Sequence, residues 1–308
     1  MSAQLGLGES IDLAHVLTHH VLADAGVRAL FVKGPAARAH GFRPPSYVSS
    51  DVDVLCDPAE FTTACSAAEA AGWQLYPGNS RDSHLLGAHA TTYVVPGWPS
   101  TVDLHNHFPG LLAPPQEVFE TLWAAREEIA VAHLPTPVPR PSAHFVVLAV
   151  NCLRSTAAGV GEQLPELRTA WSSLTSSERV EAVAIARTVG ALEPLRGAFA
   201  ALGADAGAVD PRFRRGLRAW HAFRADPGDS GGAWLGRVGS RPWRDRPAHL
   251  LRAVWDVNLD HSRTPEEWAA AGPLGRSLAR VDRARRGGLA VARMTSARLR
   301  RPRGGGMP

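Results

Sequence analysis

The sequence predicts an α+β protein in which a region of strands and helices comes first and an all-helical region follows. Short apolar runs typical of strands alternate with helical patterns through the first 137 residues. A proline-rich segment, residues 135–141 (PTPVPRP), then interrupts the chain. From residue 142 onward the apolar residues recur at helical spacing, with no strand pattern.

The elements of the first region follow from the apolar spacing and from the residues that interrupt it. Gly26 and Gly72 end two helical patterns, and Pro35 suits the first position of a short helix. Residues 96–99 (PGWP) join two β-prone runs as in a hairpin. We expect helices at residues 11–25, 35–40, 58–72 and 116–127, and strands at 29–32, 51–55, 73–76, 90–95, 101–108 and 129–134.

The chain is expected to have three parts. Residues 1–137 form an α+β domain, residues 138–290 a helical domain, and residues 291–308 a basic, disordered tail. In the second part we expect helices at residues 142–154, 162–171, 176–190, 192–202, 211–224, 246–257, 265–271 and 274–286.

Composition excludes several classes of protein. The chain has 308 residues, of which 45% are hydrophobic and 20% charged, as in a globular protein with a real core. No stretch approaches the roughly 20 apolar residues that cross a bilayer, and residues 1–9 lack the basic start of a signal peptide. The cysteines number three, which argues against a disulfide framework. We expect a soluble, cytoplasmic protein without a membrane partner.

Basic residues are distributed unevenly along the chain. The segment 276–303 holds ten arginines against a single acid, Asp282. It is either a solvated helix with a frayed tail or a surface for phosphate or nucleic acid. Lys33 is the only lysine in the chain. This indicates a position at which arginine, with its planar guanidinium group, does not replace lysine.

Three aspartates point to a metal site. Asp51 and Asp53 flank one apolar residue at the start of a predicted strand, so their side chains share one face. Such close like charges destabilise a fold unless a proton or a cation lies between them. Asp103 lies on another predicted strand and would face the pair if the two strands are neighbours. An oxygen-rich site of this kind suits Mg²⁺, with Mn²⁺ as an alternative.

The order and spacing of these motifs resemble the polymerase β-like nucleotidyltransferase superfamily, and within it the bacterial uncharacterised nucleotidyltransferases. The motifs are Lys33–Gly34 after an apolar strand, residues 50–55 (SDVDVL), and residues 102–105 (VDLH). The resemblance covers about the first 135 residues, and the helical region only in character. It implies a catalytic domain at residues 1–137, built as a mixed sheet flanked by helices, with an NTP as substrate.

The resemblance also implies roles for the catalytic aspartates. Asp51 and Asp53 would hold both metal ions, while Asp103 would complete one of them and act as the base for the acceptor hydroxyl. His105 is expected to orient Asp103 or to contact the substrate. As an alternative, His105 and His107 form a His-x-His pair that could bind Zn²⁺ in a hydrolase.

The nucleotide-binding residues are expected around the first motif. Gly34 would let the backbone approach the triphosphate, and Ser50 and Arg43 are further candidates. Members of the superfamily have a serine after this glycine, whereas this chain has Pro35. Lys33 therefore either supplies the missing phosphate contact or has a structural role.

The expected function is Mg²⁺-dependent transfer of a nucleoside monophosphate from an NTP to a hydroxyl acceptor. The acceptor is a small molecule, a peptide, a protein or RNA, with natural-product or peptide modification as one setting. Two alternatives remain open. One is kinase-like phosphoryl transfer from the same site, and the other is a catalytically degenerate protein that binds a nucleotide or a partner.

Overall fold

The computed structural model describes residues 6–76, 89–154, 160–208, 210–214 and 216–217, and shorter stretches at 220–221, 243–244, 246–248, 251, 271–282, 284–285 and 288. The chain forms two compact units, Met1–Leu217 and Arg218–Pro308. In the second unit residues 272–282 are helical. Most of the helices expected at 246–257 and 265–271, and the tail, lie outside the described residues. Among the described helices none has the length and apolar character needed to cross a bilayer.

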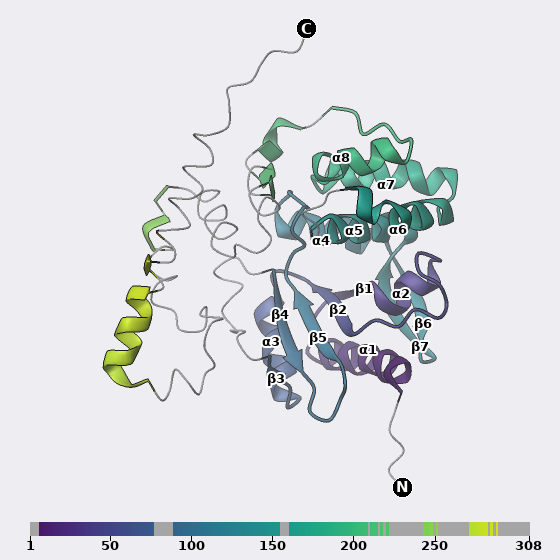
Figure 1. Ribbon diagram of the computed structural model, residues 1–308. Helices are drawn as coiled ribbons and strands as arrows, with labels where there is room; N and C mark the ends of the chain where they lie inside the picture. Colours follow the sequence, from purple (N-terminus) through teal and green to yellow (C-terminus); the bar gives the residue numbers. More distant parts are fainter. Residues whose placement is uncertain are drawn as a thin grey trace. The chain divides into compact units, whose positions relative to one another are not determined.

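The first unit is built on a five-stranded mixed sheet (Figure 1). Its strands are β1 (Ala29–Val32), β2 (Asp51–Cys56), β3 (Gln74–Leu75), β4 (Ala90–Val94) and β5 (Thr101–His105). They lie in the order β1-β2-β5-β4-β3, with β2 and β5 parallel and the other neighbours antiparallel. The expected hairpin around residues 96–99 is confirmed as β4–β5.

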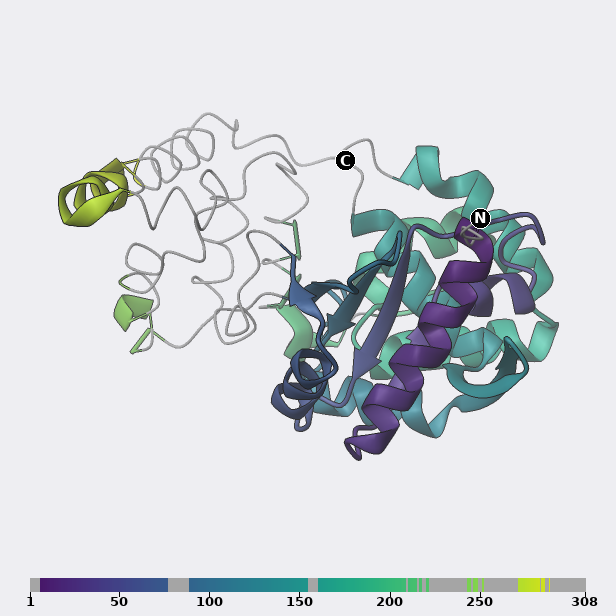
Figure 2. The same cartoon turned by 90° about the horizontal axis from the view of Figure 1, so that it is seen from below.

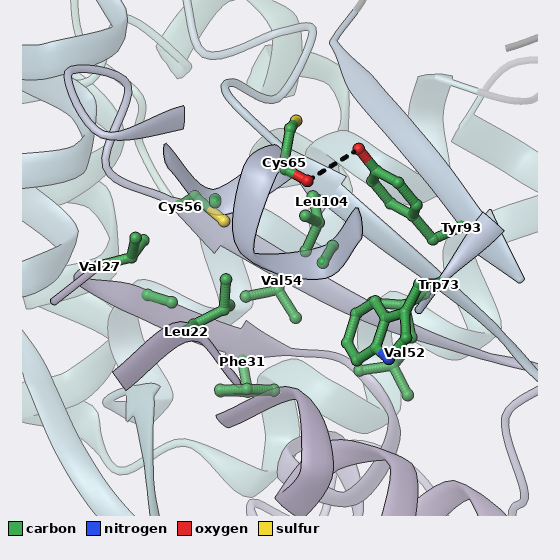
Figure 3. Close-up of a cluster of buried hydrophobic side chains, with 14 of the residues drawn as sticks. Leu22, Val27, Phe31, Val52, Val54, Cys56, Cys65, Trp73, Tyr93 and Leu104 are labelled. Atoms are coloured by element: carbon green, nitrogen blue, oxygen red, sulfur yellow. Dashed lines mark hydrogen bonds between the residues drawn. The ribbon is translucent and has the colours of Figure 1, made fainter. Parts of the chain in front are cut away.

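Helices cover one face of the sheet. These are α1 (Leu7–Asp24) and α3 (Phe61–Ala70), and Figure 2 shows α1 lying along the strands. Alternate residues of β2, namely Val52, Val54 and Cys56, are buried on this face. Each large apolar side chain buried in such a core contributes about 1.5–3 kcal/mol. The core, part of which Figure 3 shows, is one contiguous cluster that leaves the intervening residues of β2 on the opposite face.

The helical part follows the sheet. A short helix, α2 (Gly34–Ala39), comes directly after β1, and α4 (Pro115–Ala124) follows β5. The later helices are α5 (Pro141–Arg154), α6 (Val160–Ser173), α7 (Ser176–Thr188) and α8 (Leu192–Ala201), and Pro211–Phe213 is a 3-10 turn. Helix α5 is buried along most of its length because α6, α7 and α8 all pack against it. The expected α+β class, with helices after the sheet, is confirmed.

One prediction fails at the end of the sheet region. The segment expected as a proline-rich linker is a strand, β7 (Leu134–Pro139), which pairs antiparallel with β6 (Arg126–Val131). The expected strand at residues 129–134 is therefore only part of a hairpin. The expected domain boundary at residue 137 falls inside β7, and the division into a catalytic and a helical domain stays a prediction.

The hairpin has a clear physical explanation. Proline occupies positions 135, 137 and 139, so the missing N–H groups all fall on one side of β7 and the ladder uses the other side. The two-residue turn is Ala132–His133, with φ of 44° and 69°. Such turns usually carry Asn or Gly, which tolerate positive φ, so the sequence gives no turn signal here.

Candidate active site

Two of the three expected aspartates are brought together by strand register. Asp53 on β2 and Asp103 on β5 are direct partners in the parallel pair. Register partners have side chains on the same face of the sheet. That face is the one opposite the apolar core, since Val52 and Val54 alternate with Asp53 and are buried in that core. The sheet therefore presents two carboxylates side by side.

Asp53 is held by two nitrogen donors. The Lys33 ammonium lies 2.7 Å from Asp53 Oδ1, and His105 Nε2 lies 2.9 Å from the same oxygen. Asp53 is only 3% exposed, and burial alone would raise its pKa. The hydrogen bond from His105 and the charge of Lys33 outweigh that burial and hold the pKa of Asp53 well below its usual range. Asp53 is therefore ionised at neutral pH.

Asp103 differs from Asp53 in its partners. Its Oδ1 atom is buried and has no hydrogen-bond partner among the described residues. The Nδ1 atom of His105 is likewise buried and unpartnered within the described part of the chain. An unpaired buried polar atom is unfavourable by roughly 1–3 kcal/mol unless a ligand or an ion satisfies it. Both atoms are therefore available to bind a ligand or an ion.

These residues fit a divalent cation. One ligand atom from each of Asp53, Asp103 and His105 lies within 4.8 Å of the others. Two carboxylates suit Mg²⁺ or Mn²⁺, and an imidazole nitrogen is compatible with Mn²⁺ and Zn²⁺. His105 Nε2 donates to the Asp53 carboxylate, which leaves the lone pair of the neutral ring on the buried, unpartnered Nδ1.

Asp51 is not one of the three converging residues. Neighbouring same-face residues of a strand are roughly 6.6 Å apart along it. Burial, followed by the charge of Asp53, raises the pKa of Asp51, and the charge of Asp103 adds to this effect. Asp51 therefore shares the electrostatic field of the cluster, and its role as a metal ligand stays a prediction.

His105, at the end of β5, and His107, two residues beyond it, have different contacts. His105 holds Asp53 and not, as expected, Asp103, since the adjacent strand β2 brings the Asp53 carboxylate within hydrogen-bond reach of the ring. His107 is bonded through Nδ1 to Asn106 Oδ1 and does not belong to the converging group. The zinc pair considered as an alternative is therefore not among the possible metal-ligand groups of the described residues.

The Lys33–Gly34 turn is strained. Lys33 has φ 62° and Gly34 has φ 40°, and a non-glycine residue at positive φ costs about 1–3 kcal/mol. A Cβ atom on Gly34 would lie 3.1 Å from Ser49 Oγ and 3.3 Å from two atoms of the His15 ring. Glycine is thus required here because the backbone has a positive φ and because a side chain would be crowded. The contact of Gly34 with a triphosphate stays a prediction.

The other two expected nucleotide-binding residues have different surroundings. Ser50 is exposed at the start of β2. The Arg43 guanidinium forms an ion pair with Glu166 of α6 and lies 4.7 Å over the ring of Tyr47. Burial raises the pKa of Tyr47, and the charges of Arg43, Asp51 and Asp53 also act on it. Arg43 thus lies near the cluster, with its charge already paired.

Two residues of α5 reach the site and were missed by sequence reasoning. His144 Nε2 lies 2.9 Å from the backbone nitrogen of Lys33. Arg154 bonds to His89 Nε2 and forms no ion pair in the part of the chain that the structure describes. Burial lowers the pKa of Arg154, although the charges of Asp53 and Asp103 oppose that effect. No local motif marks either residue, because only the packing of α5 brings them to the sheet.

Carboxylates on two adjacent parallel strands of a mixed sheet, followed by helices, fit the nucleotidyltransferase arrangement that the motifs implied. The profile of a family described as "Uncharacterised nucleotidyltransferase" matches residues 15–200, and the chain belongs to this family. The match extends from α1 to α8 and so includes the helical part. The expected family is therefore confirmed.

The chain also matches a solved structure, at low similarity. The fold is similar to the crystal structure of an antigenic nucleotidyltransferase-like protein from Paracoccidioides brasiliensis, at 14% identity and a TM-score of 0.37. That match covers 69% of this chain and 99% of the other. No curated protein matches the sequence.

Proposed function

We propose that the protein transfers a nucleoside monophosphate from an NTP to a hydroxyl acceptor and releases pyrophosphate. The observation that carries this proposal is the pairing of Asp53 with Asp103 across two strands, with a buried, unpartnered oxygen on Asp103. Membership of the nucleotidyltransferase family supports the same class of reaction. Asp51, Asp53 and Asp103 are the residues to which we assign catalysis.

The site would hold a divalent cation, Mg²⁺ in first place and Mn²⁺ as the alternative. Asp53 and Asp103 would be its ligands, with Asp51 at the edge of the group and His105 beside it. When bound, the cation neutralises triphosphate charge and makes the acceptor hydroxyl easier to deprotonate. The residues fit it because their own charges repel and Asp103 Oδ1 needs a partner.

The chain's own residues account for the remaining chemistry. The acceptor oxygen forms a bond to the α-phosphorus, and the bond from that phosphorus to the bridging oxygen breaks, so pyrophosphate leaves. Asp103 takes the acceptor proton. Lys33 and Arg154 lie beside the carboxylates as cations able to meet the triphosphate.

The ion pair between Lys33 and Asp53 favours a second candidate. An ammonium on a metal-binding carboxylate occupies part of the site that a cation needs. A protein that keeps this pair permanently would bind a nucleotide or a partner without catalysis. The two candidates differ in whether a divalent cation binds, which makes them separable by experiment.

The acceptor is left open among small molecules, peptides, proteins and RNA. We propose the cytoplasm, where NTPs are supplied, as the compartment of the reaction. Kinase-like transfer from the same site would move the γ-phosphoryl group instead. Labels on the α- and γ-phosphates distinguish the two reactions, since only nucleotidyl transfer attaches the α-label to the acceptor.

The experiment compares the wild type with the double variant Asp51→Asn, Asp53→Asn and with Asp24→Asn, an exposed acid on α1 that serves as control. Each is incubated with NTP, Mg²⁺ and candidate acceptors, and NTP consumption and product mass are measured. We expect the double variant to lose activity at least about 100-fold, as when transition-state charge stabilisation is removed. Full activity in that variant would refute the proposal.

A further inference from the structure

The strained turn at Lys33 is held by a residue far away in the sequence. Lys33 adopts φ 62° and ψ −150°, a combination that side-chain-bearing residues rarely take. Its backbone N–H donates to Nε2 of His144, at 2.9 Å and 111 residues away along the chain. His144 is fully buried. A strained conformation persists only where its surroundings determine it, and this hydrogen bond is such a determinant.

The hydrogen bond continues beyond His144. The Nδ1 atom of His144 lies 2.8 Å from Nδ1 of His40, and Nε2 of His40 lies 2.9 Å from Oε1 of Glu127. Lys33 can only donate and the Glu127 carboxylate can only accept. A single arrangement of protons satisfies all three contacts: His144 carries its proton on Nδ1 and donates to His40, which carries its proton on Nε2 and donates to Glu127.

The surroundings favour this neutral arrangement. Phe42 packs against both rings, at 5.5 Å from His40 and 5.3 Å from His144. Burial lowers the pKa of His144 far below its usual range, and burial also lowers that of His40 in spite of the opposing charges of Glu127 and Glu178. Both rings are therefore neutral at neutral pH, as the chain of donors requires.

We infer that His144, His40 and Glu127 act as positioning residues that fix the Lys33–Gly34 turn and so aim Lys33 at Asp53. We call these three residues the histidine relay. Their hydrogen bonds within the described residues lead to Lys33 and not to the three aspartates, so they act through Lys33. That the relay fixes the turn follows from the geometry alone, while its effect on nucleotide binding rests on the proposed function.

The relay joins three separate elements to the site. His144 lies on α5, His40 caps the end of α2, and Glu127 lies on β6. The β6–β7 hairpin thus takes part in holding the turn through Glu127. A change at Glu127 in the hairpin would reach Lys33 through three hydrogen bonds, and a change at His144 in α5 would reach it through one.

Protonation of His40 would break the relay. A doubly protonated His40 donates from Nδ1 to Nδ1 of His144. His144 must then accept at Nδ1 and carry its own proton on Nε2. That proton would face the N–H of Lys33, and the bond to the turn is lost. The groups facing His40 are His144 from α5, Glu127 from β6 and Glu178 from α7, together with the ring of Phe42.

Glu127 offers the mildest test because it is partly exposed, so its variants will fold. In Glu127→Ala the last acceptor is lost, and His40 no longer has a fixed tautomer. In Glu127→Gln the side-chain carbonyl still accepts from His40, so the relay survives. The control is Glu128→Ala, the exposed neighbour on the opposite face of β6.

A second pair of variants acts on His144. Gln at this position can accept from Lys33 through its carbonyl and donate to His40 through its amide, whereas Leu can do neither. His144→Gln should therefore keep the relay and His144→Leu should lose it. If His144 only filled space, His144→Leu would disturb the turn less than His144→Gln, or the two variants would not differ.

The readouts are hydrogen exchange of the Lys33 amide and the affinity for Mg²⁺-ATP in the full chain. We expect exchange about tenfold faster and affinity about tenfold weaker in Glu127→Ala and His144→Leu, as one lost hydrogen bond implies. Glu127→Gln, His144→Gln and Glu128→Ala should stay close to the wild type. The wild-type affinity should also fall from neutral to mildly acidic pH.

The outcomes separate this inference from the proposed function. Unchanged Lys33 exchange in both Glu127→Ala and His144→Leu would overturn the relay. If exchange responds as expected but the wild type does not bind Mg²⁺-ATP, the relay stands and the proposed function fails. If exchange responds and affinity is unaffected, the positioning of Lys33 for nucleotide is refuted.

Discussion

Asp53 and Asp103 are register partners on two parallel strands, and they differ in how their charges are met. Asp53 accepts from Lys33 and His105 at one oxygen. Asp103 keeps a buried oxygen without a partner among the described residues. One carboxylate is thus satisfied by the protein and the other is left for a ligand. This asymmetry supports our proposal that a ligand binds at Asp103.

Removing the Asp103 charge should abolish metal binding without unfolding the protein. In Asp103→Asn the amide keeps the shape of the side chain and removes a repulsive charge beside Asp53, so the melting temperature without metal should stay the same or rise. Mg²⁺ or Mn²⁺ should raise the melting temperature of the wild type and of Asp24→Asn, but not that of Asp103→Asn. An equal metal-induced shift in all three proteins would argue against Asp103 as a ligand.

Lys33→Met should change the affinities for metal and for nucleotide in opposite directions. The ammonium lies 2.7 Å from Asp53, so its removal takes away a positive charge that repels a cation. We expect Mn²⁺ affinity to increase about tenfold, on the order of 1.4 kcal/mol for a charge near a partly buried site. ATP affinity should fall because a phosphate partner is lost. Calorimetry measures both, and weaker Mn²⁺ binding would contradict the competition between Lys33 and metal.

Gly34→Ala and Gly26→Ala form a matched pair that separates strain from crowding. Both glycines have positive φ, 40° and 71°, but a Cβ on Gly26 meets nothing within 4 Å. Gly26→Ala should lower the free energy of unfolding by about 1–2 kcal/mol from backbone strain alone. Gly34→Ala should lose about 1–2 kcal/mol more, because its Cβ crowds Ser49 and His15. Denaturant titration checks this, and equal losses would show that the space above Gly34 is free.

Acid should destabilise the first unit before its carboxylates titrate. Burial lowers the pKa of His15 from 6.5 to about 4, so the unfolded chain binds a proton that the folded chain excludes. Stability is therefore full above about pH 6.5 and falls as the pH is lowered toward 4, by about 3 kcal/mol from this group. His40 and His144 act in the same direction, whereas the raised pKa of Asp51 opposes them.

His15→Asn checks the origin of this acid effect. The substitution removes one titrating group while keeping a short polar side chain, so the free energy of unfolding should depend less steeply on pH between 6.5 and 4. A control is His20→Asn, since His20 is exposed on the same helix. A profile for His15→Asn that parallels the wild type would show that the acid loss arises elsewhere.

The sheet and its carboxylate-bearing face could be predicted because their signals are local. Alternation in β2 places Val52 and Val54 on one side and Asp53 on the other, and the pattern of β5 repeats this with Asp103. The PGWP turn marks the β4–β5 hairpin in the same way. Each of these features depends on residues only a few positions apart.

The second hairpin could not be predicted for a physical reason. Ala132 and His133 take positive φ, which is set by the pairing of β6 with β7 and not by their own preferences. Proline at alternate positions of β7 looks like a linker, although it leaves the hydrogen-bonding side intact. Tertiary pairing overrides local propensity at this place.

The site was predicted only in part because its contacts come from distant segments. Sequence spacing groups Asp51 with Asp53, but the converging set is Asp53, Asp103 and His105. The contact between His144 and Lys33 depends on how α5 packs, 111 residues away from the turn. Nothing in the spacing of the motifs indicates such a contact.

The most direct test of the account is calorimetric titration of the full-length protein with a non-hydrolysable ATP analogue, with and without Mg²⁺. The comparison is between the wild type, the double variant Asp53→Asn, Asp103→Asn, and Asp24→Asn. We predict binding that requires Mg²⁺ in the wild type and in Asp24→Asn, and no Mg²⁺-dependent binding in the double variant. Equal binding with and without Mg²⁺, or binding that survives the loss of both aspartates, would contradict it.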